Sequence, residues 1–413
     1  MAHPERGGAG EVFVAFLRLG LLSFGGPLAH LGYFRDAFVA RRRWLDDAAY
    51  AELLALCQLL PGPASSQAGF AIGLGRGGLP GGLAAWAGFT LPSALLMLGV
   101  AWGAARMEGP VAAALVHGLK LVALAVVAQA LVAMWRGLAA DLPRTAIAAA
   151  AFLLAGLGAA SGHAVAGQVG AIAAGAVAGA AILRKRVGAG KSARGAVAPP
   201  VPFLPGRRAG AAILCLAALL VLAIPALAEA GGMAGLAAHF LGAGAFVFGG
   251  GHVVLPLLDA ALVGPGLVSS SDFLAAYGAA QALPGPLFAV AAALGAMAAP
   301  QAGVAPLAGA AVALVAIFLP GLLLVSGMLP FWRALRGRPG LGAVFAGANA
   351  ATVGLIAAAL RDPLWPAAMA GPADLVIGVA GIAAALVLKP PPWILVLGLV
   401  AAALAAAFAF APG

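Results

Sequence analysis

The tripeptide Pro-Gly-Pro interrupts two apolar segments of this chain at matching places. The first copy is Pro61-Gly62-Pro63 and the second is Pro284-Gly285-Pro286, and each begins three residues after a glutamine, Gln58 or Gln281. Paired prolines remove backbone donors and end a helix. Inside a bilayer, such a break is tolerated only where protein or a water-filled cavity surrounds it. Matched broken segments in two halves of a membrane chain are typical of a transporter binding site.

Composition places the chain in a membrane. Hydrophobic residues make up 63% of the sequence and charged residues only 9%, whereas a soluble chain carries roughly 25% charged residues. Several apolar runs exceed the length of about 18 residues that marks a spanning helix. The net charge of +10 comes from basic residues in short loops, which indicates cytoplasmic loops and no nucleic-acid partner.

Four landmarks recur in the same order and predict an internal duplication. The offset between copies is 223 to 229 residues, as the following pairs show: Phe24-Gly25-Gly26 with Phe248-Gly249-Gly250, the two Pro-Gly-Pro copies, Leu91-Pro92 with Leu319-Pro320, and Gly118 and Lys120 with Gly347 and Asn349. We therefore expect an N-terminal transporter repeat over 1–183, a basic cytoplasmic linker over 184–208 and a C-terminal repeat over 209–413.

Charges in the loops predict that the repeats are inverted. Arg41, Arg42 and Arg43 precede the first Pro-Gly-Pro, whereas the corresponding loop at 263–271 has no charge. Further along, the asymmetry reverses, because 333–338 is rich in arginine and its counterpart near 104–109 is not. Corresponding loops then lie on opposite sides of the membrane, with the N-terminus cytoplasmic and the C-terminus outside.

The expected fold is an all-α polytopic membrane protein with two homologous halves in inverted topology. Each half combines broken, re-entrant half-helices with spanning helices. We expect the half-helices of the first half at 11–23, 27–40, 46–60 and 64–76, and broken segments of the second half at 234–262 and 272–299. Spanning helices are expected at 79–103, 110–135, 144–160, 163–183, 209–228, 303–329, 340–360, 366–387 and 391–411. Residues 11–40 could instead form one long tilted helix.

The motifs together resemble one protein family. They are Phe24-Gly25-Gly26-Pro27 followed by His30, the loop Arg42-Arg43-Trp44-Leu45, the segment from Gln58 to Pro63, and Phe248-Gly249-Gly250-Gly251-His252. In order and spacing they resemble the chromate ion transporter family in its long, two-domain form, from about residue 11 to 411. The resemblance implies chromate efflux from the bacterial cytoplasm across the inner membrane, coupled to the proton motive force.

Chromate is a tetrahedral oxyanion, which suits helix N-termini because free N–H groups and the helix dipole both favour an anion. A helix restarting after Pro63 would present Ser65, Ser66 and Gln67 in its first turn, although a serine there could simply cap the helix. The second Pro-Gly-Pro is followed by Leu287-Phe288-Ala289, so the second site could be a scaffold. The expected substrate-binding residues are Gly25, Gly26, Pro27, His30, Gln58, Pro61, Gly62, Pro63, Ser65, Ser66, Gln67, Lys120, Gly249, Gly250, His252, Gln281, Gly285 and Asn349.

Ionisable residues inside apolar segments are candidates for charge and proton transfer. Lys120 lies well within 110–135, where a lysine costs roughly 2.5–3.5 kcal/mol on insertion scales; it could attract the dianion or extend to the interface. His117 is three residues earlier on the same helix face. His117 and Glu52 are the proton-coupling candidates, and either could instead have an ordinary packing or surface role.

Other function classes have little support. No P-loop is present, and no His, Cys or carboxylate spacing indicates a metal or other cofactor. Cys57 and Cys215 form no disulfide framework. A transporter of sulfate or another oxyanion is a close alternative to chromate export, with sulfate the expected competitor. A passive anion channel is another alternative, and a membrane-embedded enzyme would need a catalytic constellation that is not seen. Helices rich in small residues suit either a homodimer or a monomer.

Overall fold

The computed structural model describes residues 7–184, 205–335 and 338–409. Most of the expected basic linker, including Lys185, Arg186, Lys191 and Arg194, lies outside these residues. Within them, all regular secondary structure is helical. We call 7–184 the first half and 205–409 the second half.

Eight helices in the described residues are long and apolar enough to cross a membrane. They are Ala64–Ala104, Pro110–Leu138, Leu142–Ala160, Ala164–Leu183, Arg207–Ala230, Pro306–Phe331, Gly340–Ala368 and Pro392–Ala409. The segment expected to span at 366–387 is shorter, Pro372–Leu388, because the chain leaves helical geometry at Met369 and the next helix begins only after Gly371. The multi-pass membrane fold is confirmed.

The first half opens with short helices. They are α1 (Ala9–Leu22), α2 (Gly26–Phe34) continued by the π-helix η1 (Arg35–Arg41), and α3 (Asp47–Leu59). Gly25 has φ 103°, a left-handed conformation that separates α1 from α2, so residues 11–40 are not one helix. Each is shorter than the roughly 20 residues that a spanning helix needs.

α4 (Ala64–Ala104) begins directly after the first Pro-Gly-Pro and turns back on itself. Gly77 and Gly78 have non-helical backbone angles. A Cβ on Gly73 would overlap the carbonyl oxygen of Gly81, so the two parts of α4 pack closely. The predicted division into 64–76 and 79–103 corresponds to these two parts.

The second half repeats this plan after α9 (Arg207–Ala230). Its short helices are α10 (Gly232–Ala245), η3 (Gly251–Val253), α11 (Val254–Leu258), η4 (Asp259–Val263), α12 (Ser270–Ala280), η5 (Leu287–Ala289), α13 (Val290–Ala298) and η6 (Pro300–Ala302). The π-helix η4 begins at Asp259, 224 residues after η1 begins at Arg35. The offset seen in the sequence therefore extends to this rare backbone geometry.

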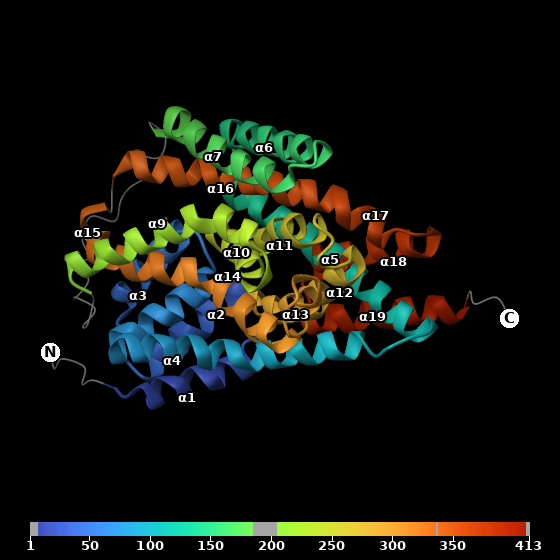
Figure 1. The fold of residues 1–413 in the computed structure, drawn as a ribbon, viewed down its shortest axis with the longest axis horizontal. Coiled ribbons are helices and arrows are strands. Elements are labelled where there is room, and N and C mark those ends of the chain that lie inside the picture. The colour runs from blue at the N-terminus through green and yellow to red at the C-terminus, as the bar shows by residue number, and fades with distance from the viewer. Residues whose placement is uncertain (1–6, 185–204, 336–337, 410–413) are drawn as a thin grey trace.

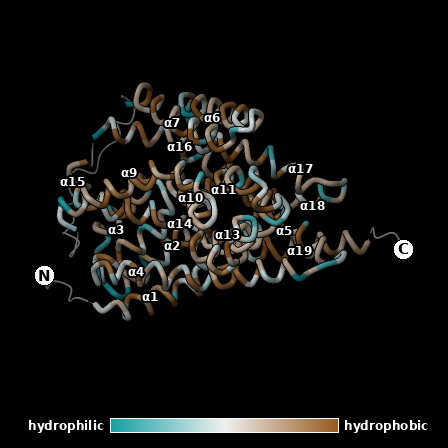
Figure 2. The backbone as a smooth tube through the Cα atoms, in the orientation of Figure 1, coloured by the Kyte–Doolittle hydropathy of each residue, from teal (hydrophilic) through white to brown (hydrophobic). Residues whose placement is uncertain are grey.

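The remaining helices, most of them long, complete the molecule (Figure 1). In the first half they are α5 (Pro110–Leu138), α6 (Leu142–Ala160) and α7 (Ala164–Ala178) with η2 (Gly179–Leu183). In the second half they are α14 (Pro306–Met328), η7 (Leu329–Phe331), α15 (Trp332–Leu335), α16 (Pro339–Ala359), η8 (Leu360–Leu364), α17 (Trp365–Ala368), α18 (Pro372–Ala383), η9 (Ala384–Leu388) and α19 (Pro392–Ala409). α6, α7 and α16 lie together along one edge, and α1 and α4 lie along the opposite edge. Most helical turns are apolar, as Figure 2 shows.

Equivalent glycines make equivalent contacts in the two halves. A Cβ on Gly20 of α1 would stand 2.8 Å from the carbonyl oxygen of Phe89 in α4, and a Cβ on Gly244 of α10 would overlap the carbonyl oxygen of Ile317 in α14. These residue pairs are separated by the repeat offset. Each half therefore uses a glycine to bring the same two helices into backbone contact.

Equivalent hydrogen bonds run from each half to the other. The amide of Gly62 donates to the carbonyl of Val247 at 2.7 Å, and the amide of Gly285 donates to the carbonyl of Ser23 at 2.9 Å. Each Pro-Gly-Pro thus binds the residue just before the Phe-Gly-Gly motif of the other half. The two broken regions form one interlocked centre.

Candidate functional site

The first turn of α4 is buried at this centre. Ser65, Ser66 and Gln67 are 3%, 3% and 0% exposed. Pro63 precedes the helix, and no side chain caps its first amides. The helix dipole places partial positive charge, about half an elementary charge, at this end. The predicted restart after Pro63 is therefore present, and it leaves donors at a buried helix terminus.

His30 of α2 lies beside this turn. Its Nδ1 is 3.5 Å from the Ser65 hydroxyl, and its Nε2 is buried with no hydrogen-bond partner among the described residues. The ring packs edge-on against Phe89 with 5.2 Å between ring centroids. α2 thus directs an imidazole toward the α4 N-terminus from a second element.

Three further hydroxyls belong to the same region, Ser23 at the end of α1 and Thr90 and Ser93 on the second part of α4. All three are buried, at 0%, 0% and 2% exposure. Gly285 connects Ser23 and Ser93, because its amide binds the Ser23 carbonyl and a Cβ on it would overlap the Ser93 hydroxyl. Thr90 follows Phe89, which packs on His30.

Most of these polar groups have no partner. In the described residues, Ser23 Oγ, His30 Nε2, Ser66 Oγ, Gln67 Oε1, Thr90 Oγ1 and Ser93 Oγ are buried without a hydrogen bond. A buried unpaired polar group costs about 1–3 kcal/mol. Native proteins rarely collect such groups in one place unless a ligand, ion or water completes them. Gln67 Oε1 can only accept, whereas the hydroxyls, an imidazole N–H and the free helix amides can donate, so most of the missing hydrogen bonds need an acceptor.

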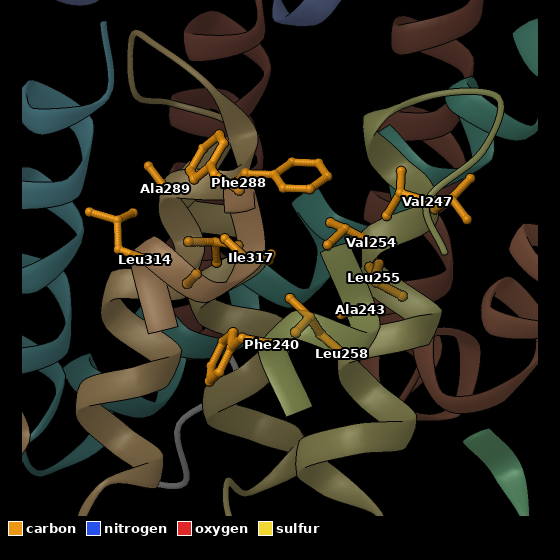
Figure 3. Close-up of a cluster of buried hydrophobic side chains, with 14 of the residues drawn as sticks. Phe240, Ala243, Val247, Val254, Leu255, Leu258, Phe288, Ala289, Leu314 and Ile317 are labelled. Atoms are coloured by element: carbon orange, nitrogen blue, oxygen red, sulfur yellow. The ribbon is translucent and has the colours of Figure 1, made fainter. Parts of the chain in front are cut away.

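The equivalent positions of the second half are apolar. At the repeat offsets, Val247 replaces Ser23, Val254 replaces His30, and Phe288 and Ala289 replace the two serines. Figure 3 shows Val247, Val254, Phe288 and Ala289 among buried side chains that consist of carbon alone. The polar cluster, which we define as Ser23, His30, Ser65, Ser66, Gln67, Thr90 and Ser93, therefore exists only in the first half.

Gln67 ties the cluster to the second half. Its Nε2 donates to the Pro61 carbonyl at 2.8 Å and to the Gly321 carbonyl of α14 at 3.1 Å. Gly321 lies at the position equivalent to Ser93. The amide group of Gln67 therefore fixes the first Pro-Gly-Pro against α14 and is a positioning group as much as a binding candidate.

Gly285 contacts Ser23 and Ser93 of the polar cluster, whereas the other predicted second-half residues have the following surroundings. His252 is hydrogen bonded to the Tyr277 hydroxyl at 2.8 Å, and the Gln281 amide reaches the Tyr277 carbonyl at 3.4 Å. Gly249 faces Thr352, whose hydroxyl donates to the Asn349 carbonyl at 2.7 Å. Gly250 is exposed. Asn349 thus belongs with the second Phe-Gly-Gly motif.

In the first half, Gly25 and Gly26 both have positive φ at the start of α2, and Pro27 occupies its first turn. Gln58 is exposed and Glu52 is half-buried on α3. Lys120 is half-buried on α5.

His117 has a partner that sequence reasoning missed. Its Nε2 lies 2.7 Å from the Asp374 carboxylate of α18, with side chains 25% and 15% exposed. The other carboxylate oxygen accepts from the amides of Ala370 and Gly371 at 3.1 and 2.9 Å. Asp374 therefore both caps α18 and joins the two halves through His117.

No group of three or more His, Cys, Asp or Glu residues with metal-binding geometry occurs in the described part of the chain. The polar cluster contains one imidazole and no carboxylate. Its donors suit an anion better than a cation.

Comparison with known proteins finds relatives over most of the chain. A family model described as chromate transporter matches residues 10–180 and 234–406. The probable chromate transport protein of Synechococcus elongatus is 28% identical over 347 residues, which cover 84% of this chain and 82% of that protein. The chromate transport protein of Cupriavidus metallidurans is 39% identical over 99 residues, 24% of this chain and 25% of that protein. No solved structure matches the chain.

Proposed function

This chain belongs to the chromate transporter family and is not an enzyme, and from this premise we propose that it exports chromate, or an oxyanion of the same shape, through one site at the polar cluster. The observation that carries the proposal is that six buried, unpartnered polar atoms belong to the polar cluster of the first half, whereas the described second half has only Asp259 Oδ1, Trp332 Nε1 and Asn349 Oδ1. A tetrahedral oxyanion accepts hydrogen bonds in several directions and would pair the hydroxyls, the imidazole and the free amides of α4 at once.

The proposed mechanism uses the two halves as an inverted repeat in the cytoplasmic membrane, with the N-terminus inside. Exchanged contacts between equivalent motifs and opposite loop charges support this arrangement. Weak, neutral donors suit a transporter, because a site with several fixed cations would hold a dianion too tightly to release it. Protons entering down their gradient would drive the anion outward, with His117 and Glu52 as coupling residues.

The test is accumulation of radiolabelled chromate in inside-out membrane vesicles with an acidic lumen, where uptake corresponds to export. The wild type should accumulate chromate above the bath concentration, and sulfate should compete. The Ser65→Ala/Ser66→Ala double variant should lose accumulation, whereas Ser161→Ala should not, because Ser161 lies exposed beside the turn that joins α6 and α7.

Other outcomes would change the proposal. Flux that only equilibrates would indicate a passive channel, since a coupled carrier moves its substrate uphill. Sulfate accumulation without chromate accumulation would retain the site but change the substrate. Full transport by the double serine variant would remove the polar cluster as the binding site.

A further inference from the structure

The equivalent helices α3 and α12 are packed unequally. α12 is buried at every residue from Phe273 to Ala279. Its Gly278 lies so close to α5 that a Cβ would overlap the carbonyl oxygen of Leu119. This backbone contact crosses from the second half to the first and leaves no space between the two helices.

α3 buries only one face. Tyr50, Leu53, Leu56 and Cys57 are buried, whereas Ala51, Ala55 and Gln58 are exposed. These exposed residues recur at intervals of three to four, so they share one side of the helix. Their counterparts at the offset of 223 are Leu274 and Gly278, which are buried, and Gln281, which is half-buried.

The residues just before the two Phe-Gly-Gly motifs are also packed unequally. Leu22 is 69% exposed, while its counterpart Phe246 is half-buried and packs on the cluster that includes Ala343 and Ala348 of α16. Phe248 also lies near Phe345 of α16, with 6.3 Å between ring centroids. Phe246 and Phe248 therefore pack against α16, whereas Leu22, the counterpart of Phe246, is exposed.

We infer that the face of α3 formed by Ala51, Ala55 and Gln58 lines the path by which an oxyanion reaches the polar cluster from the cytoplasm, and that the contact of α12 with α5 closes the path on the opposite side. The inference rests on the proposed function and its inverted topology. In an inverted repeat, an inward-open molecule becomes outward-open when α3 takes the packing that α12 has here and α12 takes that of α3. The exchanged contact would place Ala55 against Ala348, the counterpart of Leu119.

The surface at the start of α3 fits an anionic substrate. Arg41, Arg42 and Arg43 are exposed in the loop that leads to α3. Arg41 is paired with Asp36 at 2.8 Å, while Arg42 lies over the Trp44 ring. Asp46 caps α3 and Asp47 is paired with Arg35 at 2.7 Å, so residues 35–47 carry four arginines and three aspartates. The remaining positive charge at the mouth would raise the local concentration of a dianion. The exposed face itself bears only small side chains and an amide, which would let the anion pass without trapping it.

Thiol labelling tests the path without using a substrate. The background is Cys57→Ala/Cys215→Ser, first shown to insert into the membrane and to keep the wild-type Tm. Ala51→Cys and Leu274→Cys form a matched pair at equivalent positions. A membrane-impermeant thiol reagent should label Ala51→Cys from the cytoplasmic face in inside-out vesicles at least about tenfold faster than it labels Leu274→Cys from the outer face, as expected if the inward-open state dominates.

Labelling distinguishes the path from a lipid-facing surface, because only a hydrated thiol ionises and reacts. An unreactive Ala51→Cys in intact vesicles would place that face in lipid and overturn the inference. Equal labelling of Leu274→Cys from outside would do the same. If instead the labelling asymmetry is found but chromate does not accumulate, the access path stands and the proposed function fails.

A second variant tests the closed side. In Gly278→Val, the new side chain would overlap the Leu119 carbonyl oxygen. This overlap should push α12 away from α5. In this background, Leu274→Cys should become labelled from the outer face about tenfold faster than with Gly278 present. Unchanged protection of Leu274→Cys in a folded Gly278→Val protein would show that this contact does not close the path.

Discussion

The amide of Gly62 donates to the carbonyl of Val247 at 2.7 Å, although 185 residues of chain separate them. The bond needs no side chain and joins the first Pro-Gly-Pro to the second Phe-Gly-Gly region. Gly285 and Ser23 make the equivalent bond with the roles of the halves exchanged. The second half therefore positions the Pro-Gly-Pro loop that precedes α4. Neither half can move its Pro-Gly-Pro without affecting the other.

Substitution of the central glycines should be strongly destabilising. Gly62 and Gly285 have φ 120° and 89°, and a Cβ on Gly62 would stand 3.0 Å from the Gly321 Cα. Left-handed backbone alone costs an alanine about 1–2 kcal/mol, and the overlap adds to it. We expect Gly62→Ala and Gly285→Ala to lower the free energy of unfolding by at least about 2 kcal/mol, measured as a fall in Tm in detergent.

Gly99→Ala is the matched control. Gly99 lies within α4, and nothing stands within 4 Å of the position that its Cβ would occupy. An alanine there should stabilise the helix by about 0.5–1 kcal/mol. Equal Tm values for Gly62→Ala and Gly99→Ala would contradict the close approach described for the two halves.

Removal of the Ser66 hydroxyl should stabilise the anion-free protein and weaken oxyanion binding. Ser66 Oγ is buried without a partner, so Ser66→Ala should raise the free energy of unfolding of the anion-free protein by up to about 1 kcal/mol. The same change should weaken oxyanion binding by about 1–3 kcal/mol. Thermal unfolding with and without chromate would show a higher starting Tm and a smaller ligand-induced rise than in the wild type.

Ser161→Ala serves as the comparison, since its hydroxyl already donates to the Gly158 carbonyl at 3.1 Å. This variant should keep the wild-type response to chromate. If Ser66→Ala instead lowers the starting Tm and leaves the chromate-induced rise intact, Ser66 is a structural residue and not a ligand.

Asp374 should show two separable contributions to stability. Asp374→Asn retains an oxygen that can accept from the Ala370 and Gly371 amides but removes the charge facing His117. Asp374→Ala removes both, and loss of a helix cap costs about 1 kcal/mol. Tm should therefore fall modestly in the asparagine variant and by clearly more in the alanine variant. Equal losses would show that the cap contributes nothing beyond the pair with His117.

Motif chemistry made much of the fold predictable. Pro61-Gly62-Pro63 cannot continue a helix, so the break that it causes could be placed from sequence, and the structure has it there. The spanning helices followed from long apolar runs. The choice between one helix and two over 11–40 could not be made, because a single Gly-Gly does not decide whether a helix bends or stops. The left-handed φ of Gly25 decides it.

The polar cluster was predicted only in part. Ser65, Ser66, Gln67 and His30 lie next to recognisable motifs, whereas Ser23, Thr90 and Ser93 are isolated hydroxyls in apolar runs. Comparing the two repeats position by position would have exposed them, since Val247, Phe318 and Gly321 occupy the equivalent places. Asp374 carries no such signal, because its contact with His117 spans 257 residues and depends on tertiary packing.

Proton coupling through His117 should be separable from anion movement. Its imidazole faces Asp374 at 2.7 Å and lies on the same helix as Lys120, outside the polar cluster, so His117→Gln should leave the anion site intact while removing a group that gains and loses a proton. We expect this variant to lose gradient-driven accumulation of chromate but to retain exchange of labelled for unlabelled chromate in vesicles without a gradient.

Glu52→Gln, tested beside His117→Gln, addresses the second coupling candidate. If both variants accumulate chromate as the wild type does, neither residue carries the coupled proton. Loss of exchange together with accumulation in His117→Gln would mean that the residue supports the fold or the transport path and not the coupling, because a purely coupling role leaves the exchange reaction unchanged.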